Sequence, residues 1–372
     1  VNRPHNLKCM NECFKLFKLR EEEEEEEEEE IKEKSISTHK IQDGHEAPMS
    51  FERTDDSNGI QRHGSLYSLE GSKGVNQDRF GLEAEAFCGV FDGHGRFGHR
   101  VSQLVRSNLP SLLQGQMKAL DQQAIAVAED DDSKNHIDRI ETESEDSEPS
   151  KKFHKWKEAF VSSFKVMDKE IKLQENLDSS CSGTTAVVVI KQGEDLFIAN
   201  LGDSRAVLGT TRENGIEAIQ LTTDLKPALP SEAERIRACD GRVVALKQEP
   251  NIQRVWLPHI DLPGLAMSRA FGDFILKDHG IIAHPDVSYR RLTSKDQFVV
   301  LATDGVWDVL SNLEVASIVW EADSAQAAAK AVTETAVATW RRKFPSAKID
   351  DCTVVCLFLQ DKLHDHVVPV KI

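Results

Sequence analysis

Three aspartates that are far apart in the sequence each lie at one end of an apolar, strand-like run. Asp92 and Asp304 directly follow such runs, and Asp350 stands just before the run at 352–359. A carboxylate at the rim of a buried strand is costly to desolvate unless a partner neutralises it. If these strand ends converge, their oxygens form the kind of site that Mg²⁺ or Mn²⁺ prefers. The pattern therefore predicts buried strands whose ends meet at a divalent-metal site.

The length of the chain, 372 residues, allows a large hydrophobic core. No apolar run reaches the roughly 18 residues of a transmembrane helix, and the first residues lack the apolar segment of a signal peptide. Cys88, Cys352 and Cys356 lie in apolar runs, which favours reduced, buried thiols. We therefore expect no transmembrane segment and an intracellular protein, in the cytoplasm, the nucleus or both. Because the chain begins with Val1, a lipid anchor on a preceding segment stays an open alternative.

The negative charge of the chain is concentrated in one segment. The formal net charge is −17, and the ten consecutive glutamates at 21–30 leave −7 for all other residues. Binding to nucleic-acid phosphates needs a basic stripe, which this sequence lacks. We therefore expect no nucleic-acid partner.

Polar segments flank and interrupt the globular part. Residues 1–58 contain the glutamate run and predict a disordered acidic tail. Residues 129–152 hold clustered acids and a proline, and predict a disordered acidic surface insertion. One globular domain is expected over residues 59–361, followed by a short C-terminal tail at 362–372.

Between these segments, strand-like and helical patterns alternate. Large apolar residues at intervals of three and four predict an amphipathic helix with an aromatic face: Phe153, Trp156, Phe160, Phe164, Met167 and Ile171. Strands are predicted at 185–190, 195–199, 206–208 and 352–359, and helices at 231–238, 313–320 and 324–340. The turn-rich residues 200–204 favour a hairpin between the second and third of these strands. Adjacent strands without regular intervening helices favour an α+β protein of antiparallel sheets with helices outside them.

The densest local signal is Asp92-Gly93-His94-Gly95. By itself it fits a tight turn in which glycine supplies the unusual backbone conformation. Alternatively, Asp92 bridges two cations, the carbonyl of Gly93 is a further ligand, and His94 serves as a general acid near neutral pH.

Two other acids lie in similar turns. Asp308 follows the Asp304 motif, and Asp203 lies in Gly202-Asp203-Ser204-Arg205. Either one alone fits an ordinary turn equally well, so it is their conjunction with the strand-end acids that favours a metal site.

The chain resembles the metal-dependent protein phosphatases of the protein phosphatase 2C type, in their plant branch. The stretches that carry the resemblance span roughly residues 60 to 360, in the order of the family: Gly71-Ser72-Lys73-Gly74-Val75-Asn76-Gln77-Asp78, Phe91-Asp92-Gly93-His94-Gly95, Ser182-Gly183-Thr184-Thr185-Ala186, Asn200-Leu201-Gly202-Asp203-Ser204-Arg205-Ala206, Leu265-Ala266-Met267-Ser268-Arg269-Ala270-Phe271-Gly272-Asp273, Ala302-Thr303-Asp304-Gly305-Val306-Trp307-Asp308 and Asp350-Asp351-Cys352-Thr353. Two sequence stretches resemble the plant branch in particular: Asp224-Leu225-Lys226-Pro227 and Arg254-Val255-Trp256-Leu257-Pro258.

The resemblance implies a four-layer sandwich, in which two antiparallel β-sheets are flanked by α-helices. It also implies two Mn²⁺ or Mg²⁺ ions in a cleft at one end. By position, Asp92 would bridge both ions, the carbonyl of Gly93 would bind one of them, and Asp304 and Asp350 would complete the other. Asp78 would act through metal-bound water.

Other positions matched by the resemblance would serve the substrate and a weaker ion. Asp203 and Asp308 would hold a weaker third metal ion. Lys73 would grip the substrate phosphate and His94 would be the general acid. The family often has Arg at the position of Lys73, so this chain has a point charge in place of a bidentate fork. Many animal members have Glu at the position of Gln77, so this chain has one carboxylate fewer near the metals.

The function implied is a metal-dependent protein serine/threonine phosphatase, in which a metal-activated water attacks phosphorus. Phosphoprotein substrates are the expected partners; protein kinases are a further partner class that stays open, and we expect a monomer. The sequence lacks the Cys-x5-Arg loop of thiol phosphatases. A catalytically inactive scaffold that binds phosphoproteins or kinases, and a binuclear nuclease, are the alternatives.

Overall fold

The computed structural model describes residues 49–54, 61–73, 75–77, 79–83, 87–132, 147–213 and 215–360. All of them belong to one compact unit, His45–Ile372. The glutamate run, the C-terminal tail and Asp78 lie outside the described residues. None of the described helices combines the length and apolar character that crossing a bilayer needs.

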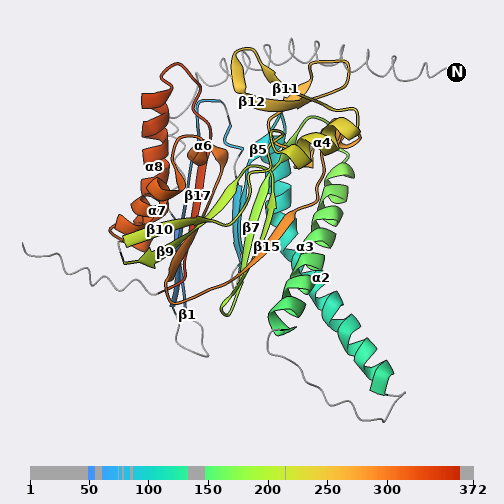
Figure 1. Ribbon diagram of the computed structural model, residues 1–372, viewed down its shortest axis with the longest axis vertical. Helices are drawn as coiled ribbons and strands as arrows, with labels where there is room; N and C mark the ends of the chain where they lie inside the picture. The colour runs from blue at the N-terminus through green and yellow to red at the C-terminus, as the bar shows by residue number, and fades with distance from the viewer. Residues whose placement is uncertain are drawn as a thin grey trace, which may run out of the picture. The chain divides into compact units, whose positions relative to one another are not determined.

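Two antiparallel sheets form the centre of the fold (Figure 1). The six strands of the first sheet are, in spatial order, β1 (Met49–Thr54), β2 (Gln61–Leu69), β17 (Cys352–Phe358), β16 (Asp296–Ala302), β9 (Arg205–Arg212) and β10 (Gly215–Gln220). The five strands of the second are β15 (Asp286–Arg291), β8 (Asp195–Leu201), β7 (Ala186–Gln192), β4 (Phe87–Phe91) and β3 (Arg79–Glu83).

Alternating side chains of the central strands fill two different cores, since successive residues of a strand point to opposite faces. In β16, Val299 and Leu301 pack against the second sheet, whereas Phe298 and Val300 pack beneath the helices. This explains why the strand reads as a continuous apolar run rather than an alternating one.

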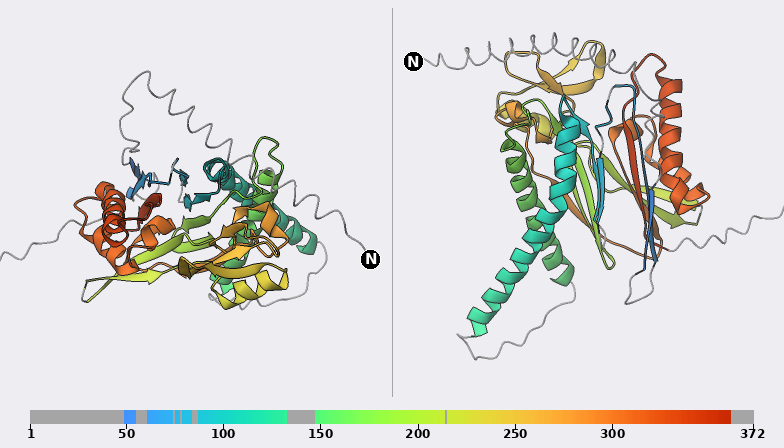
Figure 2. Two further views of the ribbon diagram at one scale, coloured as in Figure 1. Left: turned by 90° about the horizontal axis from the view of Figure 1, so that it is seen from above. Right: turned by 180° about the vertical axis from the view of Figure 1, so that it is seen from behind.

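Helices cover the outer face of each sheet. On the first sheet lie α7 (Asn312–Glu321) and α8 (Ala325–Lys343), and on the second lie α2 (Gly98–Asp132) and α3 (Ser147–Lys172). Figure 2 shows the two helix pairs on opposite outer sides of the sheets. The predicted four-layer α+β sandwich is thus confirmed.

The predicted aromatic helix is α3. Phe160, Phe164, Met167 and Ile171 are completely buried, and Trp156 stacks on a phenylalanine of β8 with ring centroids 5.4 Å apart. The predicted helices at 231–238, 313–320 and 324–340 correspond to α4 (Pro230–Ala238), α7 and α8. Cys88, Cys352 and Cys356 are buried and form no disulfide bond among the described residues, as predicted.

Short elements line one end of the sandwich. A three-stranded sheet consists of β11 (Arg242–Leu246), β12 (Glu249–Trp256) and β13 (Pro263–Leu265), and a smaller one of β14 (Phe271–Gly272), β6 (Gly183–Thr184) and β5 (Gly93–His94). Two single-turn helices, α5 (Phe274–Lys277) and α6 (Asp304–Trp307), complete this end.

The predicted hairpin around residues 200–204 is wrong. β8 pairs with β7 and β15 in one sheet, while β9 pairs with β10 and β16 in the other. Turn residues predict where a chain reverses, but they do not determine whether the two strands bond to each other. Gly202, with φ +103°, makes the turn that carries the chain between the sheets.

The boundaries of the predicted tail and insertion also need correction. β1 lies inside the predicted tail at 1–58, because its backbone pairs with β2 along the sheet edge. Helices enter the predicted insertion at 129–152 from both sides, since α2 continues to Asp132 and α3 begins at Ser147. Once a helix is nucleated by its buried turns, extending it by a few polar residues costs little free energy.

Candidate metal centre

A cavity of about 1160 Å³ opens at the end of the sandwich where the short elements gather. The described residues that sequence reasoning singled out all line it: Lys73, Asp92, Gly93, His94, Asp203, Asp304, Asp308 and Asp350. Because β16 and β17 are antiparallel neighbours, the end of one strand meets the start of the other, which places Asp304 beside Asp350. Asp92 reaches the cavity from β4, in the opposite sheet. The strand ends therefore converge, as their sequence pattern predicts.

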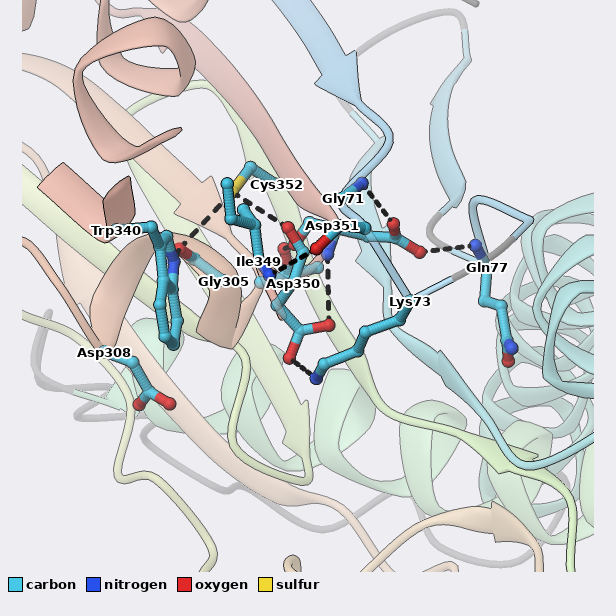
Figure 3. A network of polar contacts seen from close by, with 12 residues as sticks. Gly71, Lys73, Gln77, Gly305, Asp308, Trp340, Ile349, Asp350, Asp351 and Cys352 are labelled. Atoms are coloured by element: carbon cyan, nitrogen blue, oxygen red, sulfur yellow. Dashed lines mark hydrogen bonds and ion pairs between the residues drawn. The ribbon is translucent and has the colours of Figure 1, made fainter. Parts of the chain in front are cut away.

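The wall that carries Asp350 is tied to the loop following β2. Lys73 Nζ forms an ion pair with Asp350, and the neighbouring Asp351 accepts hydrogen bonds from the backbone nitrogens of Gly71 and Gln77, both at 2.8 Å. Figure 3 shows these contacts arranged around the two adjacent aspartates. Sequence reasoning gave Asp351 no role, although it holds in place the loop that presents Lys73.

Asp304 lies where negative charge is densest. Burial raises the pKa of its carboxyl well above the ordinary value, and the nearby charges of Asp350, Asp203 and Asp308 raise it further. Crowded, desolvated carboxylates favour binding of a cation, because a cation removes their mutual repulsion.

Asp203 and Asp308 face a lysine that sequence reasoning missed. Lys226 Nζ lies 3.6 Å from Asp203 Oδ2 and 3.6 Å from Asp308 Oδ1. Burial raises the pKa of Asp203 and opposes ionisation of Lys226, but the neighbouring carboxylates outweigh burial and the pKa of Lys226 is raised. The available signal was the stretch Asp224-Leu225-Lys226-Pro227, which had served only to identify the plant branch.

His94 is paired with a second residue missed in the sequence, Asp273. His94 Nε2 donates to Asp273 Oδ2 at 2.6 Å, and the aspartate side chain is 1% exposed. Burial lowers the pKa of His94, but the carboxylates of Asp273 and Asp203 together outweigh burial and the net pKa is raised.

The approach of these two side chains depends on Gly183. It lies between β5 and β14 in the small sheet, and a Cβ at this position would collide with Asp273 Oδ2 and lie 2.7 Å from His94 Nε2. A glycine is therefore required where the histidine and aspartate meet.

The donor set fits hard divalent ions. The cavity offers carboxylate and backbone oxygens, the ligands that Mg²⁺ and Mn²⁺ prefer. Oδ1 of Asp203 is buried without a hydrogen-bond partner among the described residues. In the described part of the chain no three His, Cys, Asp or Glu side chains stand close enough together to form a ready ligand group, and two lysines neutralise the acids instead.

The sequence matches the family model described as Protein phosphatase 2C over residues 56–342. A relative from Arabidopsis thaliana, probable protein phosphatase 2C 72, is 52% identical over 311 residues, which cover 82% of this chain and 87% of the relative. One from Oryza sativa subsp. japonica, probable protein phosphatase 2C 38, is 51% identical over 321 residues, covering 81% and 70%.

Among solved structures, the serine-threonine phosphatase 2C of Toxoplasma gondii superposes with a TM-score of 0.66 at 24% identity, covering 84% of this chain and 99% of that one. A C. elegans sex determining protein superposes with a TM-score of 0.59 at 22% identity, covering 80% and 65%. At these identities the two structures establish the shared fold.

Proposed function

The chain belongs to the protein phosphatase 2C family, and we propose that it hydrolyses phosphoserine and phosphothreonine in proteins at the carboxylate-lined cavity. The observation that carries this proposal is the convergence of Asp92, Asp304 and Asp350 from two sheets on one cavity. The enzyme is a metal-dependent protein serine/threonine phosphatase, and phosphoproteins are its substrates.

We assign two Mn²⁺ or Mg²⁺ ions to this cavity. Asp92 and the carbonyl of Gly93 would bind on the side of the second sheet, with Asp92 shared by both ions, and Asp304 and Asp350 would bind on the side of the first. A weaker third ion is assigned to Asp203 and Asp308. When bound, such ions supply Lewis acidity and lower the pKa of the attacking water.

Lys73 is proposed to hold the phosphoryl group. Its side chain is 52% exposed and its ammonium faces Asp350 in the cavity. This ammonium would neutralise a phosphoryl oxygen by a charge-assisted hydrogen bond, and Asp350 would be among the residues that hold a cation.

His94 is proposed to protonate the departing serine or threonine oxygen. Nε2 donates to Asp273, and Nδ1 is buried without a hydrogen-bond partner among the described residues. We therefore assign the transferred proton to Nδ1. The charge of Asp273 also stabilises the protonated ring, which the reaction requires at its start.

A phosphothreonine peptide tests the activity. We expect phosphate release that depends on added Mn²⁺ or Mg²⁺ and stops with EDTA. Metal binding by calorimetry without any turnover would favour the inactive-scaffold alternative, and cleavage of DNA or RNA under the same conditions would favour the nuclease.

Replacing Lys73 with methionine tests the phosphate contact. A hydrogen bond to a charged group is worth about 1.5–3 kcal/mol, so KM for the peptide should rise about 10- to 100-fold. Lys73→Arg retains the charge and should keep KM close to that of the unmodified enzyme. An unchanged KM in Lys73→Met, measured by steady-state kinetics at saturating Mn²⁺, would remove Lys73 from substrate binding.

A further inference from the structure

The backbone around Lys226 is fixed beside the turn that carries Asp203. Leu225 N donates to Gly202 O at 2.9 Å, and Ser268 N donates to Leu225 O at 2.8 Å. Pro227 follows directly and restricts the backbone of Lys226 further. The lysine is therefore held at the third-ion carboxylates by the fold itself.

A second ion pair braces the same segment. Arg205 Nε donates to Asp224 Oδ1 at 2.9 Å and Arg205 Nη2 donates to Asp224 Oδ2 at 2.5 Å. This bidentate contact joins the residue that follows Ser204 to the start of the Lys226 segment. The segment of Lys226 is thus tied to the turn of Asp203 by a backbone hydrogen bond and by this ion pair.

The side chain of Lys226, in contrast, is free to exchange. It is 39% exposed, and its ammonium stands 3.6 Å from each carboxylate, beyond ordinary hydrogen-bond distance. It supplies charge but leaves Asp203 Oδ1 without a hydrogen-bond partner among the described residues, although that side chain is 1% exposed. A buried carboxylate oxygen that lacks a donor is costly to desolvate, and a cation that comes closer than the ammonium would offset this cost.

We propose that the ammonium of Lys226 and the third divalent ion compete for Asp203 and Asp308, so that this ion binds only when Lys226 has moved aside. This inference rests on the proposed function, because it takes the two other ions as bound nearby. The ammonium of Lys226 would repel a divalent ion that bound the carboxylates of Asp203 and Asp308 while the lysine stayed beside them. The low affinity proposed for the third ion is therefore explained by competition with Lys226. It does not require that the site have too few ligands.

The test is calorimetric titration of the full chain with Mn²⁺, with bound ions counted by equilibrium dialysis. In Lys226→Met the weakest site should tighten by on the order of tenfold or more, because a positive charge next to the ion is removed. The matched control is Lys348→Met, since Lys348 lines the same cavity and its removal changes net charge equally. The control should change the weakest site by less than about threefold.

Two further variants test whether Lys226 acts by competing with the ion for Asp203. Adding Asp203→Asn to Lys226→Met should abolish the gain, because it removes the charged carboxylate for which the cations compete. Lys226→Arg should weaken the third site, since a guanidinium binds carboxylates through a planar fork. This second direction remains measurable even if the methionine variant fails to fold.

Two results would overturn the inference: a weakest site no tighter in Lys226→Met than in Lys348→Met, or one that tightens in Lys226→Arg. If neither the unmodified chain nor any variant bound ions at the two tighter sites, the result would instead contradict the proposed metal centre. The two failures are therefore distinguishable without any measurement of turnover.

Discussion

Replacing Asp304 with alanine should abolish phosphate release from a phosphothreonine peptide. The change removes a proposed direct ligand, and loss of a metal's Lewis acidity costs several kcal/mol, equivalent to about 10³-fold or more in kcat. Initial rates at saturating Mn²⁺ provide the measurement. Asp323→Ala is the control, since it removes an exposed aspartate between α7 and α8, and it should retain normal activity.

The same position should show an opposite effect on stability. Because burial and neighbouring carboxylates raise the pKa of Asp304, its ionised form destabilises the metal-free fold at neutral pH. Asp304→Asn should therefore raise Tm in EDTA while removing the Tm increase that Mn²⁺ gives the unmodified chain. Retained activity, or a lower Tm in EDTA, would contradict the assignment of Asp304.

Replacing His94 with alanine should lower kcat on a phosphopeptide by roughly 10²–10⁴-fold, the range of general acid–base catalysis. The deficit should be much smaller on p-nitrophenyl phosphate, because a nitrophenolate leaves without needing a proton. Equal deficits on the two substrates would show that His94 does not protonate the leaving group.

The pH dependence gives an independent check of the same assignment. A general acid must be protonated, so activity falls as pH rises through the pKa of His94. Asp273 raises that pKa, so Asp273→Asn should move the alkaline limb of the kcat profile to lower pH. An unmoved limb would contradict the pairing as a determinant of catalysis.

Local sequence patterns predicted antiparallel sheets with helices outside them and identified the strand-end acids, whereas the four layers were implied by the family resemblance. The alternation of β16 side chains between two cores and the three- and four-residue spacing of α3 follow from the geometry of single elements. The acids at strand ends were informative because desolvation makes them costly wherever they occur. The proposed role of Asp78 stays a prediction.

Features that depend on distant segments were not accessible in this way. Asp273 meets His94 across 179 positions of sequence, and Lys226 meets Asp308 although the two residues lie on segments far apart in the sequence. Neither pairing leaves a periodic signal, since each depends on tertiary packing. The same holds for Asp351, whose partners Gly71 and Gln77 follow a strand near the beginning of the domain.

The contacts that join the region of β2 to the region of β17 have a consequence for the timing of biosynthesis. β17 pairs with β2, and Lys73 pairs with Asp350 across 277 positions, so both halves of the cavity wall come from opposite ends of the domain. A nascent chain cannot close this wall until the ribosome has released the last strand. Every shorter translation product lacks a complete active site, which keeps phosphatase activity off until synthesis of the domain is finished.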